Sequence, residues 1–380
     1  MNIIVAPDSF KDCLSAKEVG SYISKGIRRV YPKAIVNEIP LSDGGEGLID
    51  ALLEGVGGEL KSVPVLDPLG RSIHAEFGIF KDGTTAIIEL ARASGLELLR
   101  KNERNPLLTS TYGTGELIRA ALDQGCKKII VGLGGSATND GGTGMLKALG
   151  ARFLNKIGEE IDEGGGGLID LHRVDLAHFD ARLAHCEMIV ACDVSNPLAG
   201  PDGASFIYGA QKGGDRKALE QLDRNMQHYG TIIKEQFQID VANKQGSGAA
   251  GGTGAALLAF MNGKMVNGIE LVLQIVGMEQ YLGKADLVIT GEGKIDGQTL
   301  NGKTIMGISK MAKNQGVPVI VLTGKIGKQI DAIYESGVKA VFSIVDRPMG
   351  LEEALNGAPQ LLERAAMNIM GTIKAFKNNI

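Results

Sequence analysis

A glycine-rich polar loop is the part of this chain whose residue types best suit anion binding. Between Val131 and Gly150 the sequence reads VGLGGSATNDGGTGMLKALG, in which an apolar strand pattern leads into the loop and a helical pattern leaves it. Glycine lets backbone N–H groups come close to a ligand, and a helix N-terminus adds the positive end of its dipole. The sequence therefore predicts a phosphate-binding loop; the alternative is a tight turn that is rich in glycine for steric reasons alone. The predicted nucleotide or phosphate contacts are Gly134, Gly135, Ser136, Thr138, Asn139, Gly141 and Gly142.

Other polar loops also follow apolar strand patterns, and they carry most of the charged residues of interest. These loops are Ala6–Lys11, Leu41–Gly47, Ala191–Pro201 and Thr290–Gly297. In open parallel sheets, ligands bind at the carboxyl ends of the strands, which is where we expect these loops to lie. Together with the glycine-rich loop, these loops contain the carboxylates Asp8, Asp43, Glu46, Asp140, Asp193, Glu292 and Asp296. The candidate cations are Lys11, Lys212 and Lys294.

This mixture of charges is typical of a phosphoryl transferase. Carboxylates can hold Mg²⁺ and orient a hydroxyl group, and lysines and N–H dipoles can offset the charge of the transferring group. Each aspartate alone would more often be a turn residue or a helix cap, but so many such loops in one chain favour a functional role. Asp140 and Asp193 are the candidate ligands of Mg²⁺.

Some glycine motifs match known nucleotide-binding formulas but stand in the wrong context. Gly297–Thr304 fits GxxxxGK[ST], yet the segment GEGKID separates it from the strand pattern that ends at Thr290. Gly246–Gly251 fits GxGxxG but follows the polar segment VANKQ. Gly132–Ala137 does follow a strand pattern, but no acidic residue lies about twenty positions later to hold a ribose. An NAD-dependent hydroxyacid dehydrogenase is therefore only an alternative.

Composition excludes several classes of protein. The chain has 380 residues, a net charge of −4 and no long basic run, which argues against a nucleic-acid or anionic-membrane surface. Its four cysteines form no CxxC pair, so neither a disulfide scaffold nor a zinc site is expected. No signal peptide and no transmembrane segment is expected, because a strand pattern begins at Asn2 and no apolar run is long enough to cross a bilayer. We expect a cytoplasmic monomer or homodimer that binds small molecules.

The order of predicted elements indicates an α/β fold with two domains. Residues 1–57 form a βαβα pattern whose first helix opens with a capping box from Ser15 to Glu18. From Glu59 the pattern changes to an antiparallel meander, and after Gly283 short buried strands alternate with helices again. We therefore predict a discontinuous Rossmann-like parallel-sheet domain from 1–59 and 283–380, and an inserted mixed α/β domain from 60–282 with antiparallel strands.

Long segments of the sequence also resemble the motifs of a known protein family. The chain resembles the bacterial type-1 glycerate kinase family in motifs that occur in that family's order and span almost the whole chain. These motifs are VAPDSFKDCLSA (Val5–Ala16), PLSDGGEG (Pro40–Gly47), NPLLTSTYGTGELI (Asn105–Ile118), GGSATNDGG (Gly134–Gly142), ACDVSNPLAGP (Ala191–Pro201) and ADLVITGEGKIDGQT (Ala285–Thr299). Asp12 departs from the pattern, because the family more often has glycine there, and this difference puts substrate affinity in question.

The resemblance implies phosphorylation of D-glycerate by ATP and Mg²⁺, with 2-phosphoglycerate as the product, in the catabolism of organic acids. A non-catalytic nucleotide-binding regulatory protein on the same scaffold is a further alternative. Asp193, which ends a strand pattern, is the best candidate to orient or deprotonate the glycerate hydroxyl, and Lys11 beside Ser9 could hold the carboxylate. The predicted catalytic residues are Asp193, Lys11 and Asp43; the predicted substrate contacts are Asp8, Ser9, Lys11, Asp43, Glu46 and Lys212; and the remaining predicted nucleotide contacts are Glu292, Lys294 and Asp296.

Overall fold

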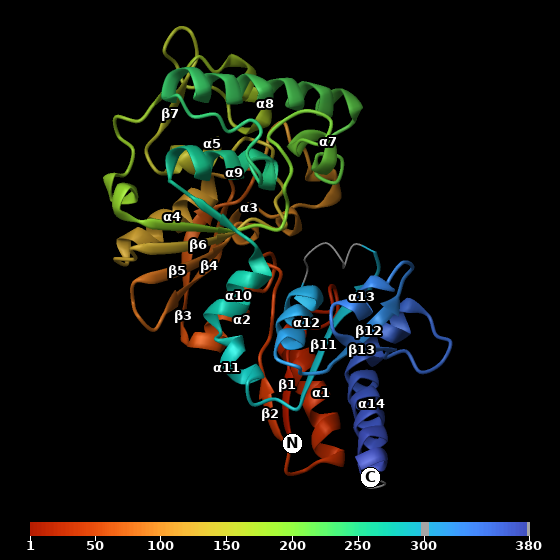
Figure 1. Ribbon diagram of the computed structural model, residues 1–380. Coiled ribbons are helices and arrows are strands. Elements are labelled where there is room, and N and C mark those ends of the chain that lie inside the picture. The colour runs from red at the N-terminus through yellow and green to blue at the C-terminus, as the bar shows by residue number, and fades with distance from the viewer. Residues whose placement is uncertain (298–303, 378–380) are drawn as a thin grey trace. The chain divides into compact units, whose positions relative to one another are not determined.

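The computed structural model describes residues 1–297 and 304–377, and its chain divides into two compact units. Unit 1 comprises Met1–Asp43, Asp50–Val56 and Asn267–Ile380, and unit 2 comprises Gly44–Ile49 and Gly57–Val266. Both units are α/β, and each is built around its own sheet (Figure 1).

Unit 1 contains a parallel five-stranded sheet in the order β13-β12-β11-β1-β2. Its strands are β1 (Asn2–Val5), β2 (Ile35–Glu38), β11 (Leu287–Ile295), β12 (Val319–Ile326) and β13 (Val338–Ser343). Its helices are α1 (Ala16–Val30), most of α2 (Leu48–Val56), α10 (Gly268–Ile275), α11 (Met278–Leu282), α12 (Thr304–Asn314), α13 (Ala332–Glu335) and α14 (Leu351–Lys377). A parallel sheet with crossover helices is the Rossmann-like arrangement that the sequence predicts.

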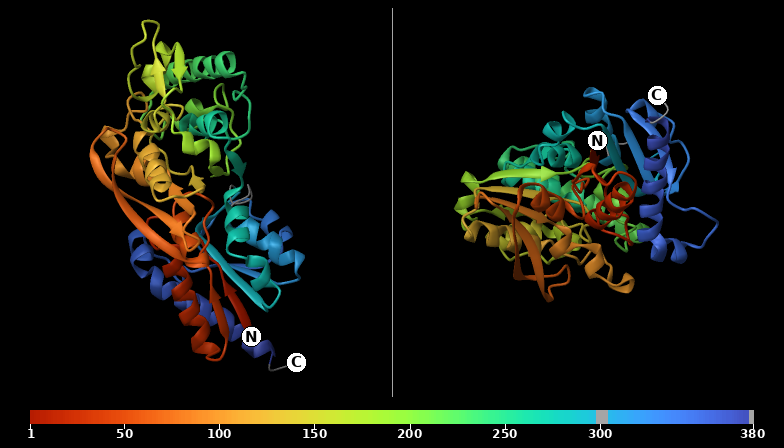
Figure 2. Two further views of the ribbon diagram at one scale, coloured as in Figure 1. Left: turned by 90° about the vertical axis from the view of Figure 1, so that its left-hand side faces the viewer. Right: turned by 90° about the horizontal axis from the view of Figure 1, so that it is seen from below.

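Helix α1 shows how local sequence sets these elements. Ser15 accepts a hydrogen bond from the Glu18 backbone N–H and Glu18 accepts one from the Ser15 backbone, so the predicted capping box is confirmed. The apolar face of α1, including Ile23 and Ile27, is fully buried against the sheet and α14. The two helices approach so closely that a Cβ atom at Gly26 would lie 2.3 Å from the Glu363 carbonyl oxygen. The start of β1 and the end of α14 lie at the same end of unit 1 (Figure 2).

Unit 2 contains a mixed six-stranded sheet in the order β10-β9-β6-β5-β4-β3. Its strands are β3 (Gly58–Leu66), β4 (Ser72–Phe80), β5 (Thr85–Glu89), β6 (Lys128–Gly132), β9 (Glu187–Ala191) and β10 (Lys264–Val266), and β7 (Arg152–Leu154) pairs with β8 (Arg173–Asp175) apart from it. The first three strands are antiparallel, which confirms the predicted meander, and the last three continue the sheet in parallel from β5.

The helices of unit 2 pack with this sheet. They are α3 (Ala91–Ser94), α4 (Tyr112–Asp123), α5 (Thr143–Ala148), α6 (Gly164–Gly167), α7 (Ala204–Tyr208), α8 (Arg216–Phe237) and α9 (Ala249–Phe260), with short 3₁₀ helices at Leu96–Leu98, Lys101–Glu103, Leu168–Asp170 and Ala181–His185. The strands and helices share one large apolar core, in which Phe77, Phe153 and Tyr229 are fully buried.

The bounds of the units differ from the predicted domains in one substantial way. Residues 267–282 belong to unit 1, whereas the sequence places them in the inserted domain. The physical reason is the packing of α10, because a Cβ atom at Gly307 of α12 would lie 2.7 Å from Ile269 Cγ1. The sequence also misses β10, whose three residues are too short to give a strand pattern.

Candidate active site

The carboxyl ends of the parallel strands in unit 2 carry the glycine-rich loop and two carboxylates. Strand β6 ends at Gly132, directly before the loop, and Asp193 follows β9 in a half-buried position. Strand β5 ends at Glu89. The sequence does not indicate Glu89 as a candidate site residue, because it is the last residue of an apolar strand pattern. Glu89 is 3% exposed; it accepts hydrogen bonds from the Ile49 N–H at 2.9 Å and from Arg92 Nε at 3.1 Å.

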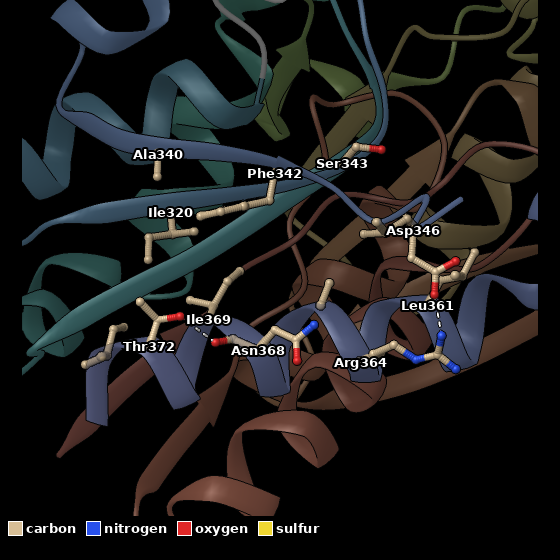
Figure 3. A pocket seen from close by; sticks show the side chains of 13 residues that line it. Ile320, Ala340, Phe342, Ser343, Asp346, Leu361, Arg364, Asn368, Ile369 and Thr372 are labelled. Atoms are coloured by element: carbon tan, nitrogen blue, oxygen red, sulfur yellow. Dashed lines mark hydrogen bonds and ion pairs between the residues drawn. The ribbon is translucent and has the colours of Figure 1, made fainter. Parts of the chain in front are cut away.

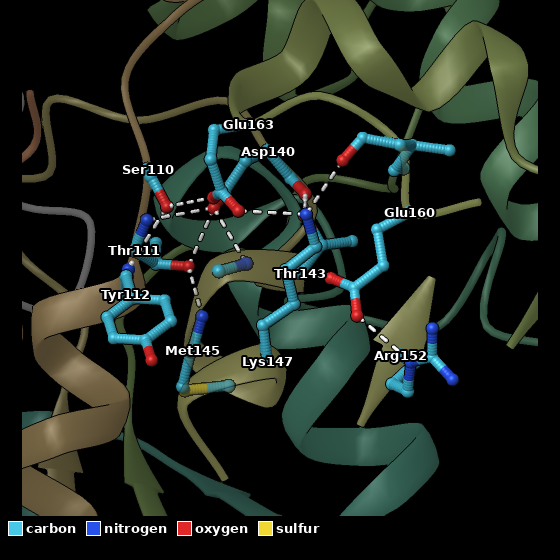
Figure 4. A network of polar contacts seen from close by, with 12 residues as sticks. Ser110, Thr111, Tyr112, Asp140, Thr143, Met145, Lys147, Arg152, Glu160 and Glu163 are labelled. Atoms are coloured by element: carbon cyan, nitrogen blue, oxygen red, sulfur yellow. Dashed lines mark hydrogen bonds and ion pairs between the residues drawn. The ribbon is translucent and has the colours of Figure 1, made fainter. Parts of the chain in front are cut away.

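Asp140 is fully buried and accepts hydrogen bonds from Thr111 and from the residues that follow it at the start of α5 (Figure 4). Its Oδ2 accepts hydrogen bonds from Thr111 N at 2.8 Å, Thr111 Oγ1 at 2.7 Å and Gly144 N at 3.2 Å. Its Oδ1 accepts one from Gly142 N at 3.1 Å. Burial raises the pKa of Asp140, and the hydrogen bonds from Thr111, Gly142 and Gly144 oppose that rise.

These contacts make Asp140 an internal anion that joins two segments of unit 2, and its role as a metal ligand stays a prediction. The N–H groups at the start of α5 point at its carboxylate, and Met145 N donates to Thr111 Oγ1 at 2.9 Å. A carboxylate at a helix start satisfies the same donors that a bound phosphate would. In this structure the Asp140 carboxylate accepts hydrogen bonds that a phosphate at this helix start would otherwise accept.

Gly141 and Gly142 also serve packing, which supports the steric alternative for the second half of the loop. The Gly141 N–H donates to the Gly251 carbonyl oxygen at 2.9 Å. A Cβ atom at Gly141 would lie 2.6 Å from Tyr229 Cε1, and one at Gly142 would lie 2.6 Å from Ala256 Cβ. Both glycines have a positive φ, so a side chain would be strained as well as crowded.

The first half of the loop is different, because it contacts a buried lysine. Lys212 is 2% exposed, and its Nζ donates to Ser136 Oγ at 2.8 Å and to the Thr138 carbonyl oxygen at 2.7 Å. Burial lowers the pKa of Lys212 to about 7, and the negative charge of Asp140 opposes this shift. Asn139 donates from Nδ2 to Ser205 Oγ at 3.0 Å. The structure thus joins Ser136 and Thr138, predicted nucleotide contacts, to Lys212, a predicted substrate contact.

Unit 1 presents a second polar group at the carboxyl ends of its strands. Asp8 follows β1, Asp43 follows β2, and Glu292 lies within β11. Asp8 Oδ1 accepts a hydrogen bond from Ser9 N at 2.6 Å, and Asp8 Oδ2 accepts one from Thr304 Oγ1. Burial, followed by the charges of Asp43 and Glu292, raises the pKa of Asp8 to about 7 against the effect of these hydrogen bonds.

Strand β11 runs further than predicted and carries two of the predicted nucleotide contacts, Glu292 and Lys294, while Asp296 follows its last residue. The segment Thr290–Gly297, predicted as a loop, is strand as far as Ile295 and pairs with β12 through Lys294 and Lys325. The Lys294 ammonium forms an ion pair with Asp296 at 2.5 Å, and the lysine side chain is 56% exposed. Lys303 and the rest of the P-loop-like motif between Gly297 and Thr304 lie outside the described residues.

The predicted substrate contacts are divided between the units. Asp8, Ser9, Lys11 and Asp43 belong to unit 1, whereas Glu46 and Lys212 belong to unit 2. Lys11 and Glu46 are exposed. Asp12 has a φ of +58°, which explains the family's preference for glycine here by backbone conformation, since aspartate also tolerates this region.

The chain from 1 to 297 and from 304 to 377 contains no group of three or more His, Cys, Asp or Glu side chains arranged to hold a metal ion. Within the same ranges, no helix has the length and apolar character needed to cross a membrane.

A cavity of about 390 Å³ lies elsewhere in unit 1, between the edge of the sheet and α14 (Figure 3). Its walls are mainly apolar and include Ile320, Phe342 and Ile369, while Asp346 and Arg364 form an ion pair beside it. This charge pair is internally neutralised, so the cavity lacks the free charges that a phosphate-transfer site needs.

Comparison with known proteins agrees with the resemblance seen in the sequence. The family model described as the glycerate kinase family matches residues 3–374. A glycerate kinase of Halalkalibacterium halodurans is 49% identical over 367 residues, 97% of each chain, and the glycerate 2-kinase of Escherichia coli is 45% identical over 379 residues, 100% of each. A crystal structure of a "putative glycerate kinase 2" from Salmonella typhimurium LT2 has a TM-score of 0.89 and 44% identity, covering 100% of this chain and 99% of that one. The chain belongs to the glycerate kinase family.

Proposed function

We propose that this protein is an ATP-dependent kinase that transfers the γ-phosphoryl group of ATP to D-glycerate, giving 2-phosphoglycerate and ADP. The observation that carries the proposal is the full-length similarity at 45% identity to a protein named glycerate 2-kinase. The charged loops at the carboxyl ends of both parallel sheet regions support it, because such loops suit phosphate and carboxylate ligands.

Glycerate is assigned to the residues that follow β1 and β2. Its carboxylate needs a cation, and Lys11 is exposed on the loop after β1, next to Ser9 and Asp8. Asp43 follows β2, the strand that pairs with β1, so the two loops start from neighbouring strands. We propose that Lys11 binds the carboxylate, while the aspartates bind hydroxyl groups as hydrogen-bond acceptors.

The nucleotide phosphates are assigned to the first half of the glycine-rich loop, from Gly134 to Thr138. Here the backbone is free of the Asp140 contacts that occupy the start of α5, and Lys212 brings its ammonium group to Ser136 and Thr138. Glu292, Lys294 and Asp296 remain proposed nucleotide contacts. When bound, Mg²⁺ would offset phosphate charge, and we favour Asp193 as its ligand, since Asp140 is fully buried and accepts hydrogen bonds at both oxygens.

The proposed partners are small molecules only, for a cytoplasmic enzyme that is a monomer or a homodimer. A role in organic acid catabolism follows from the substrate. No observation favours the dehydrogenase alternative, because the loop after β1 reads APDSFK and lacks the glycine fingerprint of dinucleotide-binding folds.

The test is ADP release by the purified protein with D-glycerate, ATP and Mg²⁺, measured by coupled oxidation of a nicotinamide reporter. We expect release that depends on glycerate, on ATP and on Mg²⁺ together. Nucleotide binding without release would support the regulatory alternative, and reduction of added NAD⁺ by glycerate without ATP would support the dehydrogenase.

A further inference from the structure

Asp8 lies in a fixed position at the carboxyl end of β1. Strand β1 is paired on both sides, with β2 and β11, and the Asp8 N–H donates to the Gly291 carbonyl oxygen at 2.8 Å. Ser9 N and Thr304 Oγ1 each donate to a different carboxylate oxygen of Asp8. A carboxylate oxygen has two acceptor positions, so each keeps one for a further donor.

Among the residues that the structure describes, the charges that act on Asp8 are negative. Asp43 follows β2 and Glu292 lies on β11, and both act on Asp8 through their charge. On the same strand, the Lys294 ammonium is paired with Asp296, and on the loop of Asp8 itself the Lys11 side chain is exposed. Such surroundings favour proton uptake by Asp8, and its pKa of about 7 agrees with this.

We infer that Asp8 is the catalytic residue that accepts the proton of the glycerate hydroxyl, and that Thr304 is a positioning residue that orients it. The inference rests on the proposed function. In the step, the O–H bond of glycerate breaks and its proton passes to an Asp8 oxygen. The hydroxyl oxygen forms a bond to the γ-phosphorus, the bond from that phosphorus to the β,γ-bridging oxygen breaks, and ADP leaves with the electron pair.

The other buried or half-buried aspartates fit this role less well. Asp140 is fully buried, and its carboxylate accepts hydrogen bonds from Thr111, Gly142 and Gly144, so a substrate hydroxyl has no access to it in this structure. Asp193, the residue that the sequence favours as the base, keeps its proposed role in orienting the hydroxyl or holding Mg²⁺. A base works best when its pKa lies near the working pH, which favours Asp8.

The experiment is the pH profile of kcat at saturating ATP, Mg²⁺ and D-glycerate for the wild-type protein and for Asp8→Asn. Wild-type activity should fall on the acid side with a midpoint near pH 7, because only ionised Asp8 accepts the proton. Asp8→Asn should lower kcat by about 10²- to 10⁴-fold and remove this acid limb. The control is Asp170→Asn, an exposed aspartate outside the proposed site, which should keep both kcat and the limb.

Two further variants test the assignment through its midpoint, which a purely structural role would not move. Thr304→Val removes a donor that stabilises ionised Asp8, so the midpoint should rise. Asp43→Asn removes a neighbouring negative charge, so the midpoint should fall. Circular dichroism is the control that tests whether each variant is folded.

The inference is overturned if folded Asp8→Asn retains kcat within about threefold of wild type, or if the Thr304→Val and Asp43→Asn midpoints do not move in opposite directions. If Asp8→Asn does not fold, the midpoints of the Thr304→Val and Asp43→Asn pH profiles decide whether the inference holds. A folded wild-type protein without glycerate-dependent ADP release would instead overturn the proposed function, and the inference with it.

Discussion

Asp140→Asn tests whether the carboxylate at the centre of the glycine-rich loop is structural or binds the metal. The substitution leaves one acceptor oxygen where two accepted hydrogen bonds from Thr111, Gly142 and Gly144. If that oxygen takes the place of Oδ2, the new amide N–H₂ faces the Gly142 N–H, and one buried donor loses its partner. Leaving it unsatisfied costs about 1–3 kcal/mol, and the bonds that remain lose their ionic character.

The net loss should be about 2–4 kcal/mol, because removing a buried charge offsets part of the penalty. For a unit of this size we expect the melting temperature to fall by roughly 2–4 °C per kcal/mol. Thermal unfolding followed by circular dichroism measures the loss, with the exposed Asp170→Asn as the control that should change nothing. The Mg²⁺ concentration that gives half-maximal activity, measured well below the melting temperature, should stay near the wild-type value. Unchanged stability with a Mg²⁺ requirement raised tenfold or more would refute this reasoning and restore Asp140 as a metal ligand.

Three further predictions follow from the remaining contacts. Lys11→Met should raise KM for glycerate much more than KM for ATP in steady-state kinetics, and the reverse would reassign Lys11 to the nucleotide. Lys212 has a pKa of about 7 when folded and 10.5 as its ordinary value, so the folded chain binds fewer protons between these limits and its stability should rise with pH there. The free energy of unfolding, measured by chemical denaturation at pH 7 and pH 9, should show this rise in wild type and a smaller one in Lys212→Met. An equal rise in both proteins would contradict the claim that burial lowers the pKa of Lys212. Gly251→Ala should destabilise the protein by roughly 2 kcal/mol more than Gly200→Ala, because both glycines have a positive φ but only at Gly251 would the new Cβ meet the Thr138 carbonyl oxygen, at 2.0 Å. Equal melting temperatures for the two variants would show that this contact relaxes freely.

Sequence alone predicted the elements whose signals are local. The capping box at Ser15 and Glu18 and the alternation of β3 and β4 depend on neighbouring residues, and both were confirmed. It failed where packing between distant segments decides. Residues 267–282 join unit 1 because Ile269 packs on Gly307, and no property of α10 itself indicates that partner.

The candidate site shows the same limit. The glycine-rich loop and its position after β6 could be read from the sequence, but not the origin of the donors that bind Asp140. Thr111 lies 29 residues before Asp140 in the chain, so its two hydrogen bonds to that carboxylate appear only in the folded structure. The glycine-rich segment Glu163–Leu168 also packs against a distant part of the chain. It contains helix α6, and a Cβ atom at Gly165 would lie 2.3 Å from the Asn139 carbonyl oxygen.

Phosphorus NMR of a reaction mixture tests the central claim most directly. Purified protein is incubated with ATP, Mg²⁺ and D-glycerate, and the spectrum is compared with authentic 2-phosphoglycerate and 3-phosphoglycerate added afterwards. The account predicts that ADP and 2-phosphoglycerate appear in equal amounts while ATP disappears. Inorganic phosphate as the only new phosphorus species, or an unchanged spectrum from folded protein, would contradict it.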